Sequence, residues 1–90
     1  SQPTLNIESN YFKIKPTIFP NPMDNSCVIN LYKEYESITI QITNLLGEVI
    51  QKRSEINSST VSIENLNTSG IYNVLLEADG EQAVFKLIKR

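Results

Sequence analysis

The sequence of 90 residues contains no histidine and only one cysteine, Cys27. Without histidine, the commonest general base is missing and neither a Ser–His nor a Cys–His nucleophile can be assembled. One cysteine forms no internal disulfide and supplies too few ligands for a zinc site. Because Cys27 stands in an apolar run without a basic neighbour, we expect a small buried side chain rather than a reactive thiol.

The chain also lacks an excess of positive charge and any long apolar run. Its 8 Lys and Arg against 10 Asp and Glu give a net charge of −2, which offers no electrostatic field for nucleic acid. No apolar segment approaches the ~20 residues of a membrane-spanning helix, so we expect no direct membrane insertion. An apolar fraction of 40% is compatible with one small folded domain.

The carboxylates are scattered, and none stands in a pattern typical of catalysis. Glu34 and Glu36 are near neighbours, but solvated charges on a loop explain them better than a pair of glycosidase carboxylates. Asp79-Gly80-Glu81 lacks the ligand spacing of a calcium loop. The sequence therefore predicts no catalytic residue, no cofactor and no metal site.

What the chain does contain is a series of short alternating runs separated by turn residues, without a helical period. The clearest run places Ile38, Ile40 and Ile42 on one face of a strand at residues 37–43. The other expected strands are residues 12–15, 17–19, 27–32, 48–52, 60–64, 70–78 and 82–89. About seven strands at this spacing predict an all-β fold, an immunoglobulin-like antiparallel β-sandwich.

The connectors contain typical turn residues. Gly47 tolerates the positive φ with which residues 44–47 can reverse the chain. Asp79-Gly80 matches a two-residue type I′ turn, which predicts that the last two strands form an antiparallel hairpin. Residues 57–60 are expected to form a polar loop. Pro20-Asn21-Pro22 cannot lie in a central strand, so it predicts a stiff turn or an exposed rigid feature read by a partner.

The last strand runs into the end of the given sequence and closes on cations. A strand at a sheet margin carries unpaired N–H and C=O groups that a partner can read by strand addition. A structural explanation stays open beside this one: Phe85 and Leu87 bury against the core, and the cations keep the edge soluble. Tyr32 and Tyr35, near a turn, are the candidates for an exposed aromatic pair.

Four segments, taken in order, resemble a known family. These are Ile18-Phe19-Pro20-Asn21-Pro22, residues 40–50 with their Asn-Leu-Leu-Gly turn, residues 66–74 with Gly70 and Tyr72, and the basic-apolar end at residues 85–90. They are similar to the C-terminal sorting domains of the type IX (Por) secretion system. Phe19 stands where tyrosine is commoner, and Ile71 where valine is frequent.

The resemblance implies an immunoglobulin-like sandwich that addresses an upstream cargo protein for export and has no activity of its own. The expected partners are the outer-membrane secretion machinery and a cell-surface sortase-like peptidase, in a Gram-negative bacterium of the Bacteroidetes group. The expected route leads through the periplasm to the cell surface or the medium. Residues 1–10 are polar and are expected to be a linker or the end of an upstream domain, and residues 11–90 the sorting domain. The resemblance places cleavage N-terminal to the domain, so residues 1–10 are expected to contain or adjoin the cleavage site.

Within the domain, we expect the machinery to recognise the terminal residues Lys86, Leu87, Ile88, Lys89 and Arg90. The residues expected to hold the motif in shape are Pro20, Asn21, Pro22, Gly47, Gly70 and Tyr72. Two alternatives stay open: a module that binds carbohydrate or a surface protein, and a spacer appended to a secreted enzyme. Self-association through the edge strands stays open as well.

Overall fold

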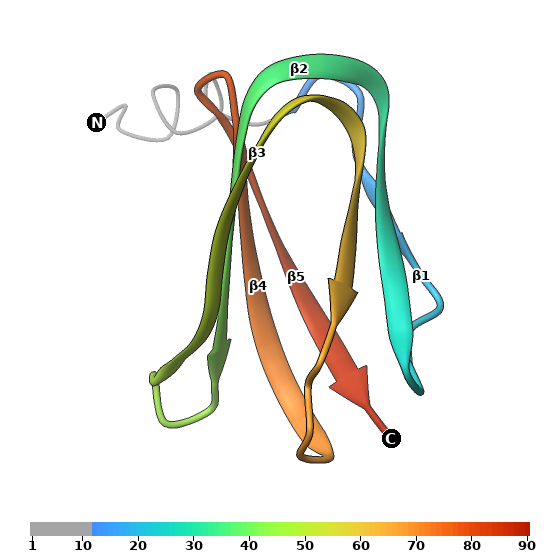
Figure 1. Cartoon of the computed structure of the whole chain (residues 1–90), viewed down its shortest axis with the longest axis vertical. Helices are drawn as coiled ribbons and strands as arrows, with labels where there is room; N and C mark the ends of the chain where they lie inside the picture. The colour runs from blue at the N-terminus through green and yellow to red at the C-terminus, as the bar shows by residue number, and fades with distance from the viewer. Residues whose placement is uncertain (1–11) are drawn as a thin grey trace, which may run out of the picture.

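The computed structural model describes residues 12–90, in which every regular element is a β-strand. The strands are β1 (Thr17–Phe19), β2 (Ser26–Asn44), β3 (Val49–Glu64), β4 (Gly70–Ala78) and β5 (Glu81–Lys89). They form one curled antiparallel sheet in the order β1-β2-β4-β5, with β3 paired to β2 (Figure 1). The all-β, antiparallel prediction is confirmed, but five strands replace the expected seven or so. The expected linker, residues 1–10, lies outside the described residues.

The lower strand count arises because β2 and β3 are long and continuous. β2 contains two of the expected strands, residues 27–32 and 37–43, and β3 contains residues 60–64 and most of 48–52. Neither strand contains a glycine or a proline, so nothing in either interrupts the ladder. The expected polar loop at residues 57–60 is therefore wrong, because these residues continue β3.

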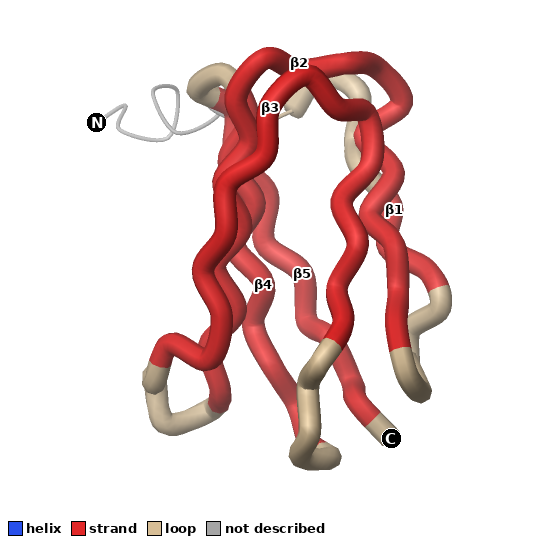
Figure 2. The backbone as a smooth tube through the Cα atoms, viewed as in Figure 1, coloured by secondary structure: helices blue, strands red, loops and turns tan. Residues whose placement is uncertain are grey.

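Both long strands bend over together at one end of the molecule, as the arch in Figures 1 and 2 shows. The register jumps from Asn30↔Thr60 to Tyr35↔Ser58, so four residues of β2 face one residue of β3. Positive φ angles of 66° at Tyr32 and 52° at Asn57 accompany the bend. An excess of residues in one strand of a pair curves the sheet. The sheet therefore curls so that its two halves enclose the core.

The expected strand at residues 12–15 is not present, because this segment has no partner with which to form a ladder. Phe12 instead packs against the core and meets the ring of Tyr35 edge-on, with 5.6 Å between centroids.

The core consists of the inward residues of every long strand. Ile38, Ile40 and Ile42 are each at most 1% exposed, as the alternation predicts, and Val74 and Leu76 of β4 are fully buried. No polar or charged residue is buried among those described. In this part of the chain, no helix has the length and apolarity to cross a membrane.

The β4–β5 hairpin turns at Asp79-Gly80, where φ is 48° and 88°, the two positive values that a type I′ turn requires. The Asp79 carboxylate also accepts hydrogen bonds from the backbone N–H groups of Glu36 and Ser37, at 3.1 and 3.0 Å. The turn thereby fastens the hairpin to β2 just beyond its bend.

Candidate functional site

The terminal residues singled out by the sequence lie on and just beyond β5, an outer strand that pairs with β4 along its whole length. The expectation that Phe85 and Leu87 pack against the core is confirmed: Leu87 is fully buried and Phe85 is partly buried. Lys86 and Ile88 alternate with them and face outward. Figure 1 shows the end of β5 beside the start of β2.

The turn that precedes β2 is hydrogen-bonded to the edge of β5 that does not pair with β4. The Asn21 side chain donates from Nδ2 to the carbonyl of Lys86 at 2.8 Å and accepts from the N–H of Ile88 at 3.0 Å. The N–H of Met23 donates to the carbonyl of Ile88 at 2.8 Å, and the N–H of Arg90 donates to the carbonyl of Met23 at 2.9 Å. We call these four hydrogen bonds the clasp. The Met23 side chain beneath them is fully buried.

The clasp corrects one expectation for the end of the chain. Four outward backbone groups between Lys86 and Arg90 already have partners, so this edge is not free for strand addition. The side chains of the terminal segment remain accessible in part. At this end of the domain, a partner therefore meets the side chains of the terminal segment rather than unpaired backbone groups.

The three terminal cations differ in their surroundings. Arg90 pairs with Asp24 at 3.4 Å, but both side chains are more than 60% exposed, so the pair contributes little stability. Lys89 donates from Nζ to the carbonyl of Arg90 at 2.7 Å. Lys86 is exposed and forms no ion pair with any described residue.

Most of the residues expected to hold the motif in shape lie close to the terminal strand. Pro20 and Pro22 flank Asn21 in the turn after β1, and both of their peptide bonds are cis. Gly70 begins β4 opposite Lys89, with φ at 152°. Tyr72, 5% exposed, lies opposite Leu87 and donates from its hydroxyl to the carbonyl of Thr68.

Gly47 adopts a φ of 89° in the β2–β3 turn, and its N–H donates to the carbonyl of Asn44 at 3.0 Å. It lies at the tip of that hairpin, whereas Pro20 to Pro22, Gly70 and Tyr72 lie against or opposite the terminal strand. The structure therefore brings most of the motif to the end of β5 and places Gly47 elsewhere.

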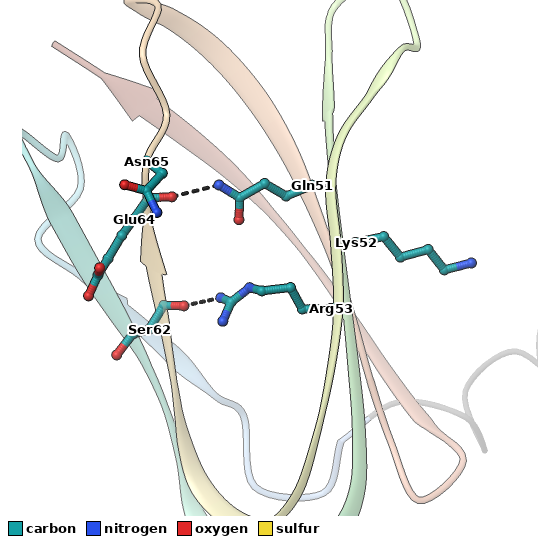
Figure 3. A pocket seen from close by; sticks show the side chains of 6 residues that line it. All are labelled: Gln51, Lys52, Arg53, Ser62, Glu64 and Asn65. Atoms are coloured by element: carbon teal, nitrogen blue, oxygen red, sulfur yellow. Dashed lines mark hydrogen bonds between the residues drawn. The ribbon is translucent and has the colours of Figure 1, made fainter.

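A polar groove of about 380 Å³ lies between the two arms of β3, which are the stretches before and after its bend. In Figure 3, Gln51 and Arg53 reach across it from one arm, while Lys52 points away. Gln51 donates from Nε2 to the carbonyl of Glu64 at 2.6 Å, and Arg53 donates to the carbonyl of Ser62. These side chains occupy backbone acceptors of the opposite arm. The six residues that line the groove include no aromatic side chain, so it does not resemble a sugar-stacking site.

The candidate aromatic pair, Tyr32 and Tyr35, is not exposed together. Tyr32 is 53% exposed at the bend of β2, but Tyr35 is only 3% exposed. Burial, and then the nearby Glu81 carboxylate, raise the pKa of Tyr35, whose hydroxyl donates to Glu81 at 3.2 Å. The two rings therefore do not form a shared platform.

The expectation for Cys27 is confirmed, since its side chain is 1% exposed. Burial raises the pKa of the thiol to about 11, so it stays protonated and inert at neutral pH. Among the described residues, no three His, Cys, Asp or Glu side chains gather in a way that would hold a metal ion.

Sequence reasoning missed Asn21 and Met23 as partners of the terminal strand. Within Pro20-Asn21-Pro22, only Asn21 has hydrogen-bond donors, because proline lacks a backbone N–H and a polar side chain. That feature marks Asn21 as notable, but no local pattern points to a partner 65 residues away.

A comparison with curated proteins gives no match. The model of one protein family, described as the secretion system C-terminal sorting domain, matches residues 17–90. The match runs from the first residue of β1 through the clasp to Arg90. The chain therefore belongs to the family of C-terminal sorting domains, which are non-catalytic signals for export out of the cell by the type IX secretion machinery.

Proposed function

We propose that the secretion machinery recognises the folded end of this domain, with Lys86, Leu87, Ile88, Lys89 and Arg90 as the recognised segment. The observation that carries the proposal is the clasp, which ties this segment to the turn at Asn21 and Met23 by four hydrogen bonds. Terminal residues usually fray unless they are tied down. A tied segment holds its side chains in one arrangement, which lowers the entropy cost of recognition.

The five residues have different tasks within this proposal. Leu87 is fully buried and therefore anchors the segment rather than contacting a partner. Lys86 and Ile88 face outward and are available for contact. Lys89 and Arg90 place two further cations at the end of the strand, which supports electrostatic orientation of an acidic partner.

We infer the finer steps of export from the family resemblance. Residues 11–90 act as the sorting domain, and their curled sheet is a variant of the immunoglobulin-like sandwich in which β2 and β3 each supply a strand to both layers. The cargo crosses the periplasm of a Gram-negative bacterium of the Bacteroidetes group and arrives at the cell surface. A sortase-like peptidase then removes the domain by cutting in or near residues 1–10.

A carbohydrate-binding module is a weaker reading of this structure. Its candidate aromatic pair is not exposed together, because Tyr35 is buried. The groove along β3 has a polar lining, and its Gln51 and Arg53 side chains already donate to backbone carbonyls. A spacer domain would not need an ordered terminal segment. Neither alternative accounts for the clasp.

The test is export of a reporter fused upstream of the chain in a host with active type IX secretion. Deletion of residues 86–90 would remove the buried Leu87 and unfold the domain, so a loss of export would not show that these residues are recognised. We therefore replace only the cations, in the triple variant Lys86→Ser, Lys89→Ser, Arg90→Ser. The matched control replaces three exposed lysines elsewhere on the domain: Lys13→Ser, Lys15→Ser and Lys52→Ser.

We expect the terminal variant to stay inside the cell and the control variant to be exported like the unaltered fusion. Both should unfold within a few degrees of the unaltered domain, since exposed substitutions change stability little. Equal export of the two triple variants would contradict the assignment of the terminal residues.

A further inference from the structure

The outward face of the C-terminal hairpin differs from that of the adjoining stretch of β2. An antiparallel sheet with one buried face usually carries polar residues on the other. The part of β2 that pairs with β4 follows this rule, because Thr39, Gln41 and Thr43 alternate with its buried isoleucines. The next two strands, β4 and β5, do not follow it.

Four apolar side chains lie on this outward face in two cross-strand pairs. Ile71 pairs with Ile88, and Leu75 pairs with Val84. Their exposed fractions are 38%, 39%, 38% and 68%. Lys86, paired with Asn73, lies between the two pairs. We call these six residues the β4–β5 outer face. Exposed apolar side chains gathered on one face of a hairpin, with a polar pair between them, are candidates for an interaction site.

Lys86 is the one charged residue of the β4–β5 outer face. Its strand neighbours on this side are Val84 and Ile88, and its direct cross-strand partner is the neutral Asn73. The two ion pairs among the described residues involve Arg53 and Arg90, so no carboxylate there neutralises Lys86. A cation set among apolar side chains complements a surface that is apolar around a carboxylate.

The clasp determines how a partner can approach this hairpin. Because Asn21 and Met23 occupy the backbone edge from Lys86 to Arg90, a partner at this end cannot extend the sheet without displacing them. The side chains of the outer face require no such displacement. Recognition through this face leaves the folded domain intact.

We propose that the β4–β5 outer face is the docking surface for a protein component of the secretion machinery, which places apolar side chains on the two pairs and a carboxylate against Lys86. This inference rests on the proposed function and adds Ile71, Leu75 and Val84 to the recognised surface. It also assigns Asn21 and Met23 a positioning role, since they hold β5 in the register that builds the face.

The test compares two double variants of the reporter fusion that make the same chemical change. Val84→Ser with Ile88→Ser alters the proposed face. Val49→Ser with Ile50→Ser alters the other outer strand of this half of the sheet, β3, where the two side chains are 54% and 43% exposed. A second matched pair reverses one exposed charge on each strand: Lys86→Glu on β5 and Lys52→Glu on β3.

We expect each β5 variant to lower the exported fraction of the reporter at least tenfold, while the β3 variants are exported like the unaltered fusion. Equal export of the β5 and β3 variants would overturn the docking surface and leave the sorting function standing. If the Val84/Ile88 variant unfolds at a lower temperature than the unaltered domain, the export of Lys86→Glu compared with Lys52→Glu decides whether the face is needed. Failure of the unaltered fusion to leave the cell would instead refute the proposed function.

A second copy of the chain is the competing occupant of this face, and sedimentation of the purified chain distinguishes it. A dimer that Val84→Ser with Ile88→Ser converts to a monomer, together with unchanged export, would make the face a self-association surface and overturn the proposal.

Discussion

Replacement of Asn21 by alanine should loosen the end of the domain by an amount that the clasp allows us to work out. The change removes two hydrogen bonds, from Asn21 to the carbonyl of Lys86 and from the N–H of Ile88 to Asn21. Each contributes about 1 kcal/mol net, and water can reach the freed groups at this exposed edge, so the loss is about 1–2 kcal/mol. For a domain of this size that corresponds to a fall in melting temperature of roughly 5–15 °C.

Thermal unfolding and amide hydrogen exchange of the purified domain measure both parts of this prediction. The melting temperature should fall, and the Ile88 amide should exchange faster because it loses its acceptor. The matched control is Asn67→Ala, which truncates an exposed asparagine whose side chain bonds to none of the described residues. If Asn21→Ala behaves like Asn67→Ala in both measurements, the clasp does not hold the terminal strand and the reasoning fails.

Three further changes test the core, the buried thiol and the hairpin turn. Ile40→Asp should unfold the domain because it buries a charge, whereas Gln41→Asp on the opposite face should shift the melting temperature little; equal melting temperatures would refute the facing of β2. Because burial raises the pKa of Cys27 from 9.0 to about 11, the thiol favours the fold below pH 9 and this contribution is lost between pH 9 and 11. Cys27→Ala should therefore show a shallower fall in melting temperature over that range, and identical slopes would contradict the burial. Asp79→Ala should cost about 1–3 kcal/mol in urea unfolding, since it leaves two backbone N–H groups of β2 without their acceptor; a change below 0.5 kcal/mol, the ordinary scatter of surface substitutions, would argue against that role.

The local parts of this fold could be predicted from the sequence. The inward face of β2 follows from the alternation of Ile38, Ile40 and Ile42, and the β4–β5 hairpin follows from Asp79-Gly80, because both depend on neighbouring residues. The bend of β2 could not be predicted, since it depends on a register shift against β3 that no local pattern specifies.

The candidate site was likewise predictable from the sequence only in its local parts. The outward and inward residues of β5 follow from its alternation, so Leu87 was recognisable as an anchor candidate. The clasp depends on two segments that meet only when the sheet curls, and Asn21 and Lys86 are 65 residues apart in the chain. The sequence marks each segment as notable without indicating that one binds the other.

The most direct test of the central claim is the location of one reporter, fused upstream of this chain, in two strains that differ only in whether type IX secretion is active. We predict that the reporter leaves the cell in the active strain and stays inside in the inactive one. The same distribution in both strains would contradict the claim that this domain is a type IX sorting signal.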